Sequence, residues 1–342
     1  MQASFKENDG LKNNLQFDNF ESIKSISNGS FGDVFLAKNH STGDYLYAIK
    51  TVRLRANESD QNIKTEIAIL EKIHSSNLKP KSIPSYFGSH KEVNKFKQIQ
   101  YNLIFEFLPK TLKSLIDETK TSKVPVPFQV MKGYFESLVN VLGYLQTMKI
   151  CHRDLKPANI LLDEKSEKIY IIDYGLSKDF IASAPDETKK VLDIEGSSMY
   201  FSPELDEAYD SEKDKILMNP YKSDVFSLGL IFLELGKLTL PKRSKDFTLW
   251  GKNIDVAFDD FEKYYQSVLK PNEQKDFQYF IKTLKKCLAI NANLRPDFIS
   301  LFKKNLKKNE DLERIKLYIL LEDLNMKDLN FKPNFDDSSN IG

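Results

Sequence analysis

The sequence has few cysteines, no excess of either charge and no long apolar run, and each shortage excludes a class of protein. Its two cysteines, Cys151 and Cys287, lie far apart and belong to neither a CxxC pair nor a cysteine–histidine cluster. This pattern predicts neither a disulfide framework nor a zinc site, and it fits a reducing compartment best. We therefore expect a cytoplasmic protein, with access to the nucleus left open.

The balance of charge and the shortness of the apolar runs limit the partners of the chain. Lysine and arginine total 50 while aspartate and glutamate total 49, so no global charge favours nucleic acid or an anionic membrane. The N-terminal stretch MQASFKENDGLKNNLQF lacks the apolar core that a signal peptide requires. The longest mainly apolar run, residues 225–235, is too short to cross a bilayer and predicts a buried helix. We expect neither a nucleic-acid partner nor a membrane partner, and the oligomeric state is left open.

What is present is typical of a globular protein with two kinds of local pattern. The 342 residues are 41% apolar, 12% aromatic and 29% charged, which is enough for a substantial core. Short alternating runs divided by Gly, Asn and Ser clusters predict strands up to residue 108, interrupted by one helix over 58–75. Helical periodicity dominates beyond residue 109. We expect an α+β fold with a small β-rich N-lobe (18–108), a larger, mainly helical C-lobe (109–304) and a ligand cleft between them.

The two ends of the chain differ from the rest. Residues 1–17 are rich in Lys, Asn and Asp and predict a disordered leader. Residues 305–342 contain the stretch DLERIKLYILLEDLNM, which predicts a tail with a short amphipathic helix. The folded domain is therefore predicted over 18–304.

Three oxygen-bearing side chains follow the predicted helix that ends near residue 147. Asp154 and Asn159 lie in the loop HRDLKPAN, and the apolar strand KIYIID then delivers Asp173. Carboxylate and amide oxygens are the ligands that Mg²⁺ prefers, and Mg²⁺ usually completes its shell with substrate phosphates and water. The pattern therefore predicts a magnesium-dependent nucleotide site.

A candidate phosphate site lies upstream, between two predicted strands. In ISNGSFGDVF, Gly29 and Gly32 would let backbone N–H groups approach phosphate oxygens, although such a turn is more often only a hairpin. Lys50 follows the apolar strand YAIK, and Glu66 lies on the next predicted helix at a distance suited to pairing. Because a buried lysine is costly without a partner, the pair would aim the ammonium group at phosphates.

In this order the segments resemble a eukaryotic protein kinase, over about residues 20–303. The family pattern is present as SNGSFGDV, YAIK, Glu66, HRDLKPAN, DYG and SPE. Further on, KSDVFSLG resembles the central helix of the family, and Arg295 matches the arginine that pairs with Glu204. The resemblance implies the two-lobed fold expected from the patterns, and it leaves the subfamily unassigned.

The resemblance also implies roles for individual residues. Asp154 would accept or orient the proton of the substrate hydroxyl, and Asn159 and Asp173 would hold Mg²⁺. Lys50, paired with Glu66, would hold the α and β phosphates of ATP. The remaining nucleotide contacts that the resemblance implies are Ile26, Ser27, Gly29, Ser30, Phe31, Gly32, Val34, Ala48, Phe105, Glu106, Leu108 and Leu161.

The acceptor of the phosphate is indicated by Lys156, which resembles the lysine of serine/threonine kinases and would neutralise charge on the transferring group. Ser197 stands where those kinases carry a threonine near Asp154 and Lys156. We expect a kinase that uses ATP and Mg²⁺ and phosphorylates serine or threonine in protein substrates. The alternatives are a pseudokinase scaffold that binds without catalysis and, less favoured because SPE and Arg295 are intact, a small-molecule kinase.

Some positions depart from the family pattern without removing a catalytic group. Ser27 replaces the first glycine, Tyr174 replaces a phenylalanine, and Phe226 replaces a tryptophan. A tyrosine can occupy a phenylalanine site if its hydroxyl finds a hydrogen-bond partner. The neighbouring His152 is expected to pack beneath the site and not to act as a base.

One expectation concerns the segment between DYG and SPE. In related kinases the arginine before the catalytic aspartate, here Arg153, usually anchors a phosphorylated residue, and the matching position holds Asp193. The sequence suggests that Asp193 pairs with Arg153 and gives partial activity without phosphate. The alternatives are a solvated loop charge or a requirement for phosphate at Ser183, Thr188, Ser197 or Ser198.

Overall fold

The computed structural model describes most of the chain but not its ends. Within the predicted glycine turn, Ser30 and Phe31 lie outside the described residues, as do most of the predicted leader and almost all of the predicted tail, its helix included. Ser183 and Thr188 also lie outside them. The described residues are 17–29, 32–55, 58–77, 79–94, 96–180 and 189–306.

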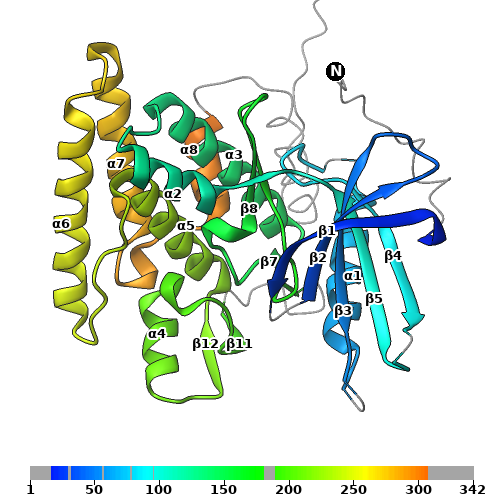
Figure 1. The fold of residues 1–342 in the computed structure, drawn as a ribbon. Helices are drawn as coiled ribbons and strands as arrows, with labels where there is room; N and C mark the ends of the chain where they lie inside the picture. The colour runs from blue at the N-terminus through cyan, green and yellow to red at the C-terminus, as the bar shows by residue number, and fades with distance from the viewer. Residues whose placement is uncertain are drawn as a thin grey trace, which may run out of the picture.

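The N-terminal part is built on one antiparallel five-stranded sheet with the strand order β1-β2-β3-β5-β4 (Figure 1). A short 3-10 turn (Phe17–Asn19) precedes the sheet, and helix α1 lies beside it. Apolar side chains from β2, β3 and β5 form a small core on one face. The elements are β1 (Phe20–Gly29), β2 (Gly32–Asn39), β3 (Leu46–Arg53), α1 (Gln61–His74), β4 (Tyr86–Val93) and β5 (Ile99–Glu106).

The spacing of the apolar residues in this stretch explains why it forms helix α1. Ile63, Leu70 and Ile73 recur at helical intervals and are all buried against the main core. Glu66 lies within the same stretch and is also buried, which is unusual for a carboxylate and requires a charged partner. The predicted helix over 58–75 is confirmed, with Asp60 preceding its first turn.

The C-terminal part is a bundle of helices around α5. This helix contains the mainly apolar run at residues 225–235, and its side chains are buried on all sides, as predicted. Its close fit to α6 depends on Gly236, where an added Cβ would lie only 2.1 Å from the Phe261 ring. The helices are α2 (Leu112–Ser122), α3 (Phe128–Thr147), α4 (Pro203–Asp210), α5 (Pro220–Lys237), α6 (Phe247–Gln266), α7 (Gln274–Cys287) and α8 (Phe298–Leu306).

Short strands between the helices carry the loops of the site. They pair as β6-β8-β9, β10-β7 and β11-β12. The loop over 152–159 connects β7 to β8 and ends in a 3-10 turn (Pro157–Asn159), and Asp173 follows β9. The strands are β6 (Lys110–Thr111), β7 (Ile150–Cys151), β8 (Ile160–Asp163), β9 (Lys168–Ile171), β10 (Lys178–Asp179), β11 (Lys190–Asp193) and β12 (Lys215–Met218).

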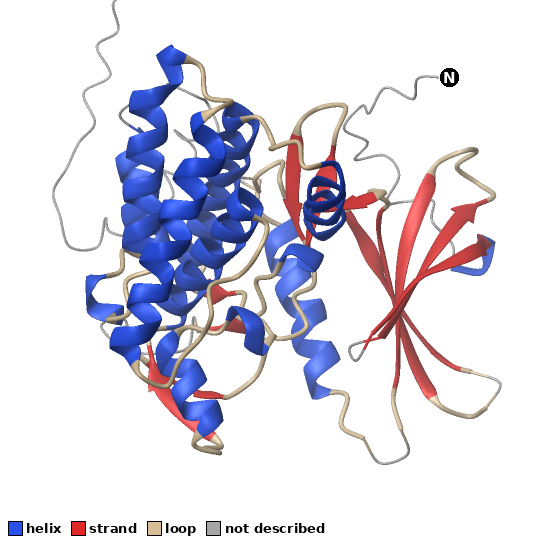
Figure 2. Cartoon of the chain, turned by 60° about the vertical axis from the view of Figure 1, so that its left-hand side comes forward, coloured by secondary structure: helices blue, strands red, loops and turns tan. Residues whose placement is uncertain are grey.

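Figure 2 shows the sheet on one side and the helical bundle on the other, which confirms the predicted two-lobed α+β fold. The chain passes from one to the other between the end of β5 and the start of β6, over residues 107–109. Among the described residues, no helix combines the length and the apolar character that crossing a bilayer would need.

Candidate active site

The loop between β7 and β8 is fixed to the helical bundle by a buried carboxylate. The backbone N–H groups of His152 and Arg153 donate to Asp224 on α5, at 2.8 and 3.0 Å. Burial raises the pKa of the Asp224 carboxyl to about 6, although these N–H groups and the nearby His152 oppose the rise. Two charge-assisted bonds from a rigid helix hold the start of the loop in one place.

Asp154 lies at the centre of the loop, and neighbouring donors fix both of its carboxylate oxygens. Lys156 Nζ is 2.7 Å from Oδ2, and the side-chain amide of Asn159 donates to the same oxygen at 3.0 Å. The backbone N–H of Ser197 donates to Oδ1 at 2.9 Å. Lys156 also donates to Ser197 Oγ at 2.9 Å. The structure thus brings together the predicted residues Asp154, Lys156 and Asn159, and it places Ser197 beside Asp154 and Lys156, as the resemblance implied.

Lys50 is buried on β3 between two carboxylates. Its Nζ is 2.7 Å from Glu66 Oε1 and 2.8 Å from Asp173 Oδ1. Burial alone would lower the pKa of Lys50, but Glu66 and Asp173 together raise it above its usual value, so the ammonium stays charged. The sequence predicted the contact with Glu66 but not the contact with Asp173. Lys50 therefore links α1 to the segment that follows β9.

Asn159 and Asp173 are brought together by a backbone contact. The backbone N–H of Ile172 donates to the Asn159 carbonyl at 3.0 Å, which places Asp173 next to Asn159. The Asn159 amide nitrogen is bonded to Asp154, so its amide oxygen is the atom that can face a cation. One carboxylate and one amide oxygen are suited to Mg²⁺, which takes few protein ligands and completes its shell with phosphates and water. The residues present fit this ion.

The predicted phosphate turn joins β1 to β2. Gly29 and Gly32 are partners in the register of this hairpin. Gly32 has φ +127°, and a Cβ there would lie 2.7 Å from the carbonyl oxygen of Thr51. A glycine is therefore required at position 32 by the backbone itself, whatever the turn binds.

The other predicted nucleotide contacts come from both parts of the molecule. Ala48 on β3 is the register partner of Phe105 on β5, so these two lie side by side in the sheet. Leu108 is buried in the connection between the two parts. Ile26 and Ser27 lie on β1, Val34 on β2, Glu106 at the end of β5, and Leu161 on β8.

Tyr174 is buried against His152, with the two ring centroids 5.5 Å apart. His152 Nε2 contacts the Ile172 carbonyl at 3.0 Å, so the imidazole packs beneath the site as expected. Within the described part of the chain, however, the Tyr174 hydroxyl has no hydrogen-bond partner. The expected hydrogen-bond partner of this tyrosine is therefore missing among the described residues. A buried hydroxyl without a partner is unfavourable, so tyrosine at this position costs stability relative to phenylalanine.

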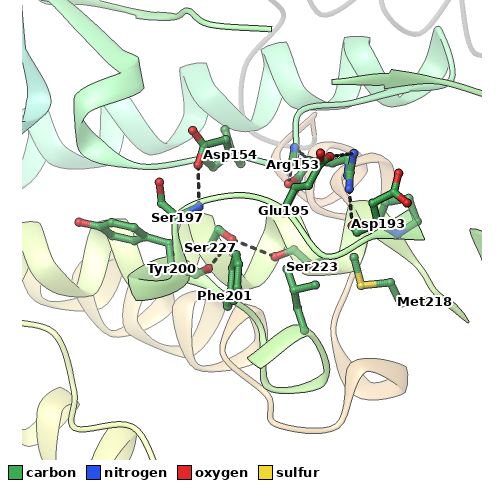
Figure 3. A pocket seen from close by; sticks show the side chains of 14 residues that line it. Arg153, Asp154, Asp193, Glu195, Ser197, Tyr200, Phe201, Met218, Ser223 and Ser227 are labelled. Atoms are coloured by element: carbon green, nitrogen blue, oxygen red, sulfur yellow. Dashed lines mark hydrogen bonds and ion pairs between the residues drawn. The ribbon is translucent and has the colours of Figure 1, made fainter. Parts of the chain in front are cut away.

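The predicted pair between Arg153 and the Asp193 carboxylate is wrong. Arg153 donates to the backbone carbonyl of Asp193 at 2.6 Å and to Glu195 Oε2 at 3.2 Å (Figure 3). The nitrogen that contacts Glu195 also donates to the Leu176 carbonyl at 3.2 Å. The Asp193 carboxylate lies 3.6 Å from Lys215 Nζ, because the two residues are register partners in β11-β12. Glu195, which the sequence did not single out, supplies the carboxylate instead.

The predicted pair between Glu204 and Arg295 is present. Arg295 donates to Glu204 Oε1 at 2.8 Å and is almost completely buried. Its guanidinium lies 4.9 Å from the centroid of Phe226, whose ring meets Trp250 edge-on. Phe226, where the resemblance implied a tryptophan, is thus a cation–π partner for the arginine and also contacts Trp250 from α6.

Sequence reasoning also missed a link between α1 and the helical part. Lys72 Nζ donates to the Met148 carbonyl at 2.9 Å and to Asp179 Oδ2 at 2.6 Å. Asp179 belongs to β10, in the same segment as Asp173. No local pattern marks this pair, because its residues lie far apart in the chain and each resembles an ordinary surface charge.

Comparison with known families agrees with this geometry. A family model described as a protein kinase domain matches residues 20–306. The match includes the β1-β2 turn, Lys50, the loop around Asp154, and Arg295. A domain of this family binds ATP and transfers phosphate to proteins, so proteins are the implied substrates. Since the match covers most of the sequence, the chain belongs to the protein kinase domain family.

Proposed function

We propose that the chain is an active serine/threonine protein kinase that uses ATP and Mg²⁺. The observation that carries this proposal is the pair of charge clusters at the site. Lys50 is held by Glu66 and Asp173, and Asp154 is held by Lys156, Asn159 and the Ser197 N–H. A pseudokinase scaffold need not retain both clusters, whereas phosphoryl transfer uses each of them.

The proposed reaction assigns one task to each cluster. Lys50 binds the α and β phosphates of ATP and orients the γ-phosphate, with Glu66 fixing the lysine. The substrate hydroxyl attacks the γ-phosphorus, the bond to the β–γ bridging oxygen breaks, and Asp154 accepts the hydroxyl proton. Lys156 stabilises negative charge on the group in transfer. Asn159 and Asp173 would hold Mg²⁺, which neutralises phosphate charge when it is bound.

The preference for serine and threonine rests on Lys156. Its ammonium contacts both Asp154 and Ser197. This arrangement agrees with the resemblance of HRDLKPAN to serine/threonine kinases.

The test is transfer of phosphate from labelled ATP to a mixed protein substrate, with and without Mg²⁺. Asp154→Asn should lower incorporation by about 10²–10⁴-fold. Asp255→Asn, on the exposed face of α6, is the matched control and should behave as the wild type. Phosphoamino-acid analysis of the product should give phosphoserine or phosphothreonine.

Two results would count against the proposal. If the wild type binds ATP but incorporates no phosphate under any condition, the pseudokinase alternative holds. If phosphotyrosine is the main product, the kinase activity stands and the assignment of the acceptor fails.

We also propose the division into a leader (1–17), a kinase domain (18–304) and a tail (305–342), and a cytoplasmic location. The balanced charge and the presence of only two cysteines, far apart in the sequence, support the location. Limited proteolysis with mass mapping tests the division, because cleavage should be confined to the two end segments and to exposed loops.

A further inference from the structure

The N-terminal end of helix α1 carries a carboxylate that does not cap the helix. Asp60 precedes the first turn, and its carbonyl accepts the backbone N–H of Lys64 at 3.0 Å, so its backbone belongs to the start of the helix. An aspartate in this position commonly accepts a hydrogen bond from a backbone N–H of the first turn, but the Asp60 side chain caps none of them. Its carboxylate is therefore available to other groups.

The Asp60 carboxylate contacts the five-stranded sheet beside α1. The Tyr101 hydroxyl on β5 donates to Asp60 Oδ2 at 2.7 Å, and Lys91 Nζ on β4 lies 3.5 Å from the same oxygen. Lys64 Nζ, one turn along α1, lies 2.9 Å from Oδ1. The hydrogen bonds from Tyr101 and Lys64 lower the pKa of the Asp60 carboxyl to about 2, so it stays ionised. We call the contacts of Asp60 with Tyr101 and Lys91 the sheet anchor.

Tyr101 needs this contact because its side chain is buried. Tyr101 is 4% exposed and belongs to the same core cluster as Ile63 of α1. Lys91 is its register partner on β4, with Nζ 5.1 Å from the centre of the Tyr101 ring. A buried hydroxyl without a partner is unfavourable, and a hydrogen bond to a charged group is stronger than one between neutral groups. The hydroxyl therefore holds Asp60 at a fixed place on β5.

The sheet anchor acts on the helix that carries Glu66. Asp60 and Glu66 are six residues apart, which is about 9 Å along a helix axis. Glu66 Oε1 contacts Lys50 Nζ at 2.7 Å, and Lys50 belongs to β3 of the same sheet. The anchor and the Lys50–Glu66 pair thus join the first two turns of α1 to the sheet at two points. Fixing the start of the helix limits how far Glu66 can move from Lys50.

We propose that Asp60 and Tyr101 are positioning residues: they attach the first turn of α1 to β5 and so hold Glu66 against Lys50 by contacts within the chain. This proposal rests on the proposed kinase activity. Loss of the Tyr101 hydroxyl or of the Asp60 carboxylate frees the first turn, so Glu66 spends less time on Lys50. The lysine then orients the phosphates of ATP less often, and the transfer step slows.

Hydrogen–deuterium exchange of the whole protein, measured without substrate, tests the anchor itself. In Tyr101→Phe the backbone amides of residues 61–67 should exchange about tenfold faster than in the wild type, since a hydrogen bond to a charged group is lost. Tyr47→Phe is the matched control, because Tyr47 is a buried tyrosine of the same sheet whose hydroxyl donates to Thr42 at 3.1 Å and not to α1. Unchanged exchange over 61–67 in Tyr101→Phe, or an equal rise in Tyr47→Phe, overturns the inference.

The second experiment measures kcat at saturating ATP and protein substrate. Tyr101→Phe should lower kcat by about threefold or more, because losing a hydrogen bond to a charged group shifts the position of the helix by at least that factor. Asp60→Ala should act as Tyr101→Phe does, whereas Lys64→Ala, which removes a contact within the helix, should resemble the wild type. Wild-type kcat in Tyr101→Phe, or an equal loss in Tyr47→Phe, overturns the inference. If the wild type transfers no phosphate, the proposed function fails, and the exchange experiment still decides whether the helix is anchored.

A double-mutant cycle separates the positioning of Glu66 from a general loss of structure. If the anchor acts through Glu66, Tyr101→Phe should lower kcat no further once Glu66→Ala has removed the side chain that is positioned, so the two effects should be non-additive. A general loss of structure would lower kcat by the same factor in both backgrounds, and that result would overturn the proposal. If Tyr101→Phe does not fold, Asp60→Ala takes its place in both experiments and in the cycle, because the Asp60 side chain is partly exposed.

Discussion

Removing the Tyr174 hydroxyl should make the protein more stable. The side chain is 3% exposed, its ring packs on His152, and its hydroxyl has no hydrogen-bond partner in the described part of the chain. Burial also raises its pKa far above the ordinary value, which reflects the same unsatisfied environment. Protein mutational data put the cost of such a hydroxyl at about 1–3 kcal/mol. Phenylalanine keeps the ring and its contacts, and loses only the packing of one oxygen atom.

We therefore expect Tyr174→Phe to raise the free energy of unfolding by about 1 kcal/mol, and Tm by about 2 °C for a domain of this size. Urea denaturation and a thermal scan measure the two quantities. Tyr265→Phe is the matched control, because the Tyr265 hydroxyl donates to the Val126 carbonyl at 2.7 Å. That variant leaves a buried carbonyl unpaired and should lose about 1–3 kcal/mol. If Tyr174→Phe loses stability as the control does, the reasoning about the unsatisfied hydroxyl is refuted.

The remaining predictions concern the charge cluster, the helix contact and pH. Glu66→Gln should lower turnover by about tenfold or more, because it removes one charge partner of a buried lysine. The protein should still fold, since Asp173 remains as the second partner of that lysine. Glu71→Gln, exposed on the same helix, is the control in the rate assay. Gly236→Ala should lose about 1–3 kcal/mol in urea denaturation, since the new methyl group meets the Phe261 ring. Gly133→Ala, where an added Cβ would meet none of the described residues within 4 Å, should be neutral or stabilising. Asp224 has a folded pKa raised from 3.8 to about 6, so between these values the folded protein binds more protons than the unfolded chain. Its contribution to the free energy of unfolding should therefore fall as pH rises through this window, and Asp224→Asn should lack that part of the slope in denaturation at successive pH values.

The parts of the fold that could be predicted from the sequence are those that local patterns determine. The spacing of apolar residues placed α1 and the buried α5, because a helix brings every third or fourth residue to one face. The residues of the site could be identified because each belongs to a short sequence motif that lies on a predicted strand, turn or helix. Lys50 at the end of an apolar strand and Glu66 inside an apolar helix are examples.

What could not be predicted depends on contacts between distant segments. The sequence suggested Asp193 as the partner of Arg153, and the structure has Glu195 there, because β11 pairs with a strand that lies beyond α4. The pairing turns the Asp193 carboxylate toward Lys215, and the register of a strand cannot be deduced without its partner. The missing partner of the Tyr174 hydroxyl, among the residues that the structure describes, likewise depends on the packing of the whole site.

Helix α1 is attached to one segment at two separate points, and this determines how it can move. Lys50 joins Glu66 to Asp173, and Lys72 joins the same helix to Asp179. The two attachment points are six residues apart on each side, which is about 9 Å along the helix axis. A helix held at one point can pivot about it, but a helix held at two points cannot pivot until one of them is released. Release of either contact should therefore free the helix to pivot about the other relative to that segment, so a change at Lys72 should alter the contacts of Lys50 although the two lysines lie on different elements.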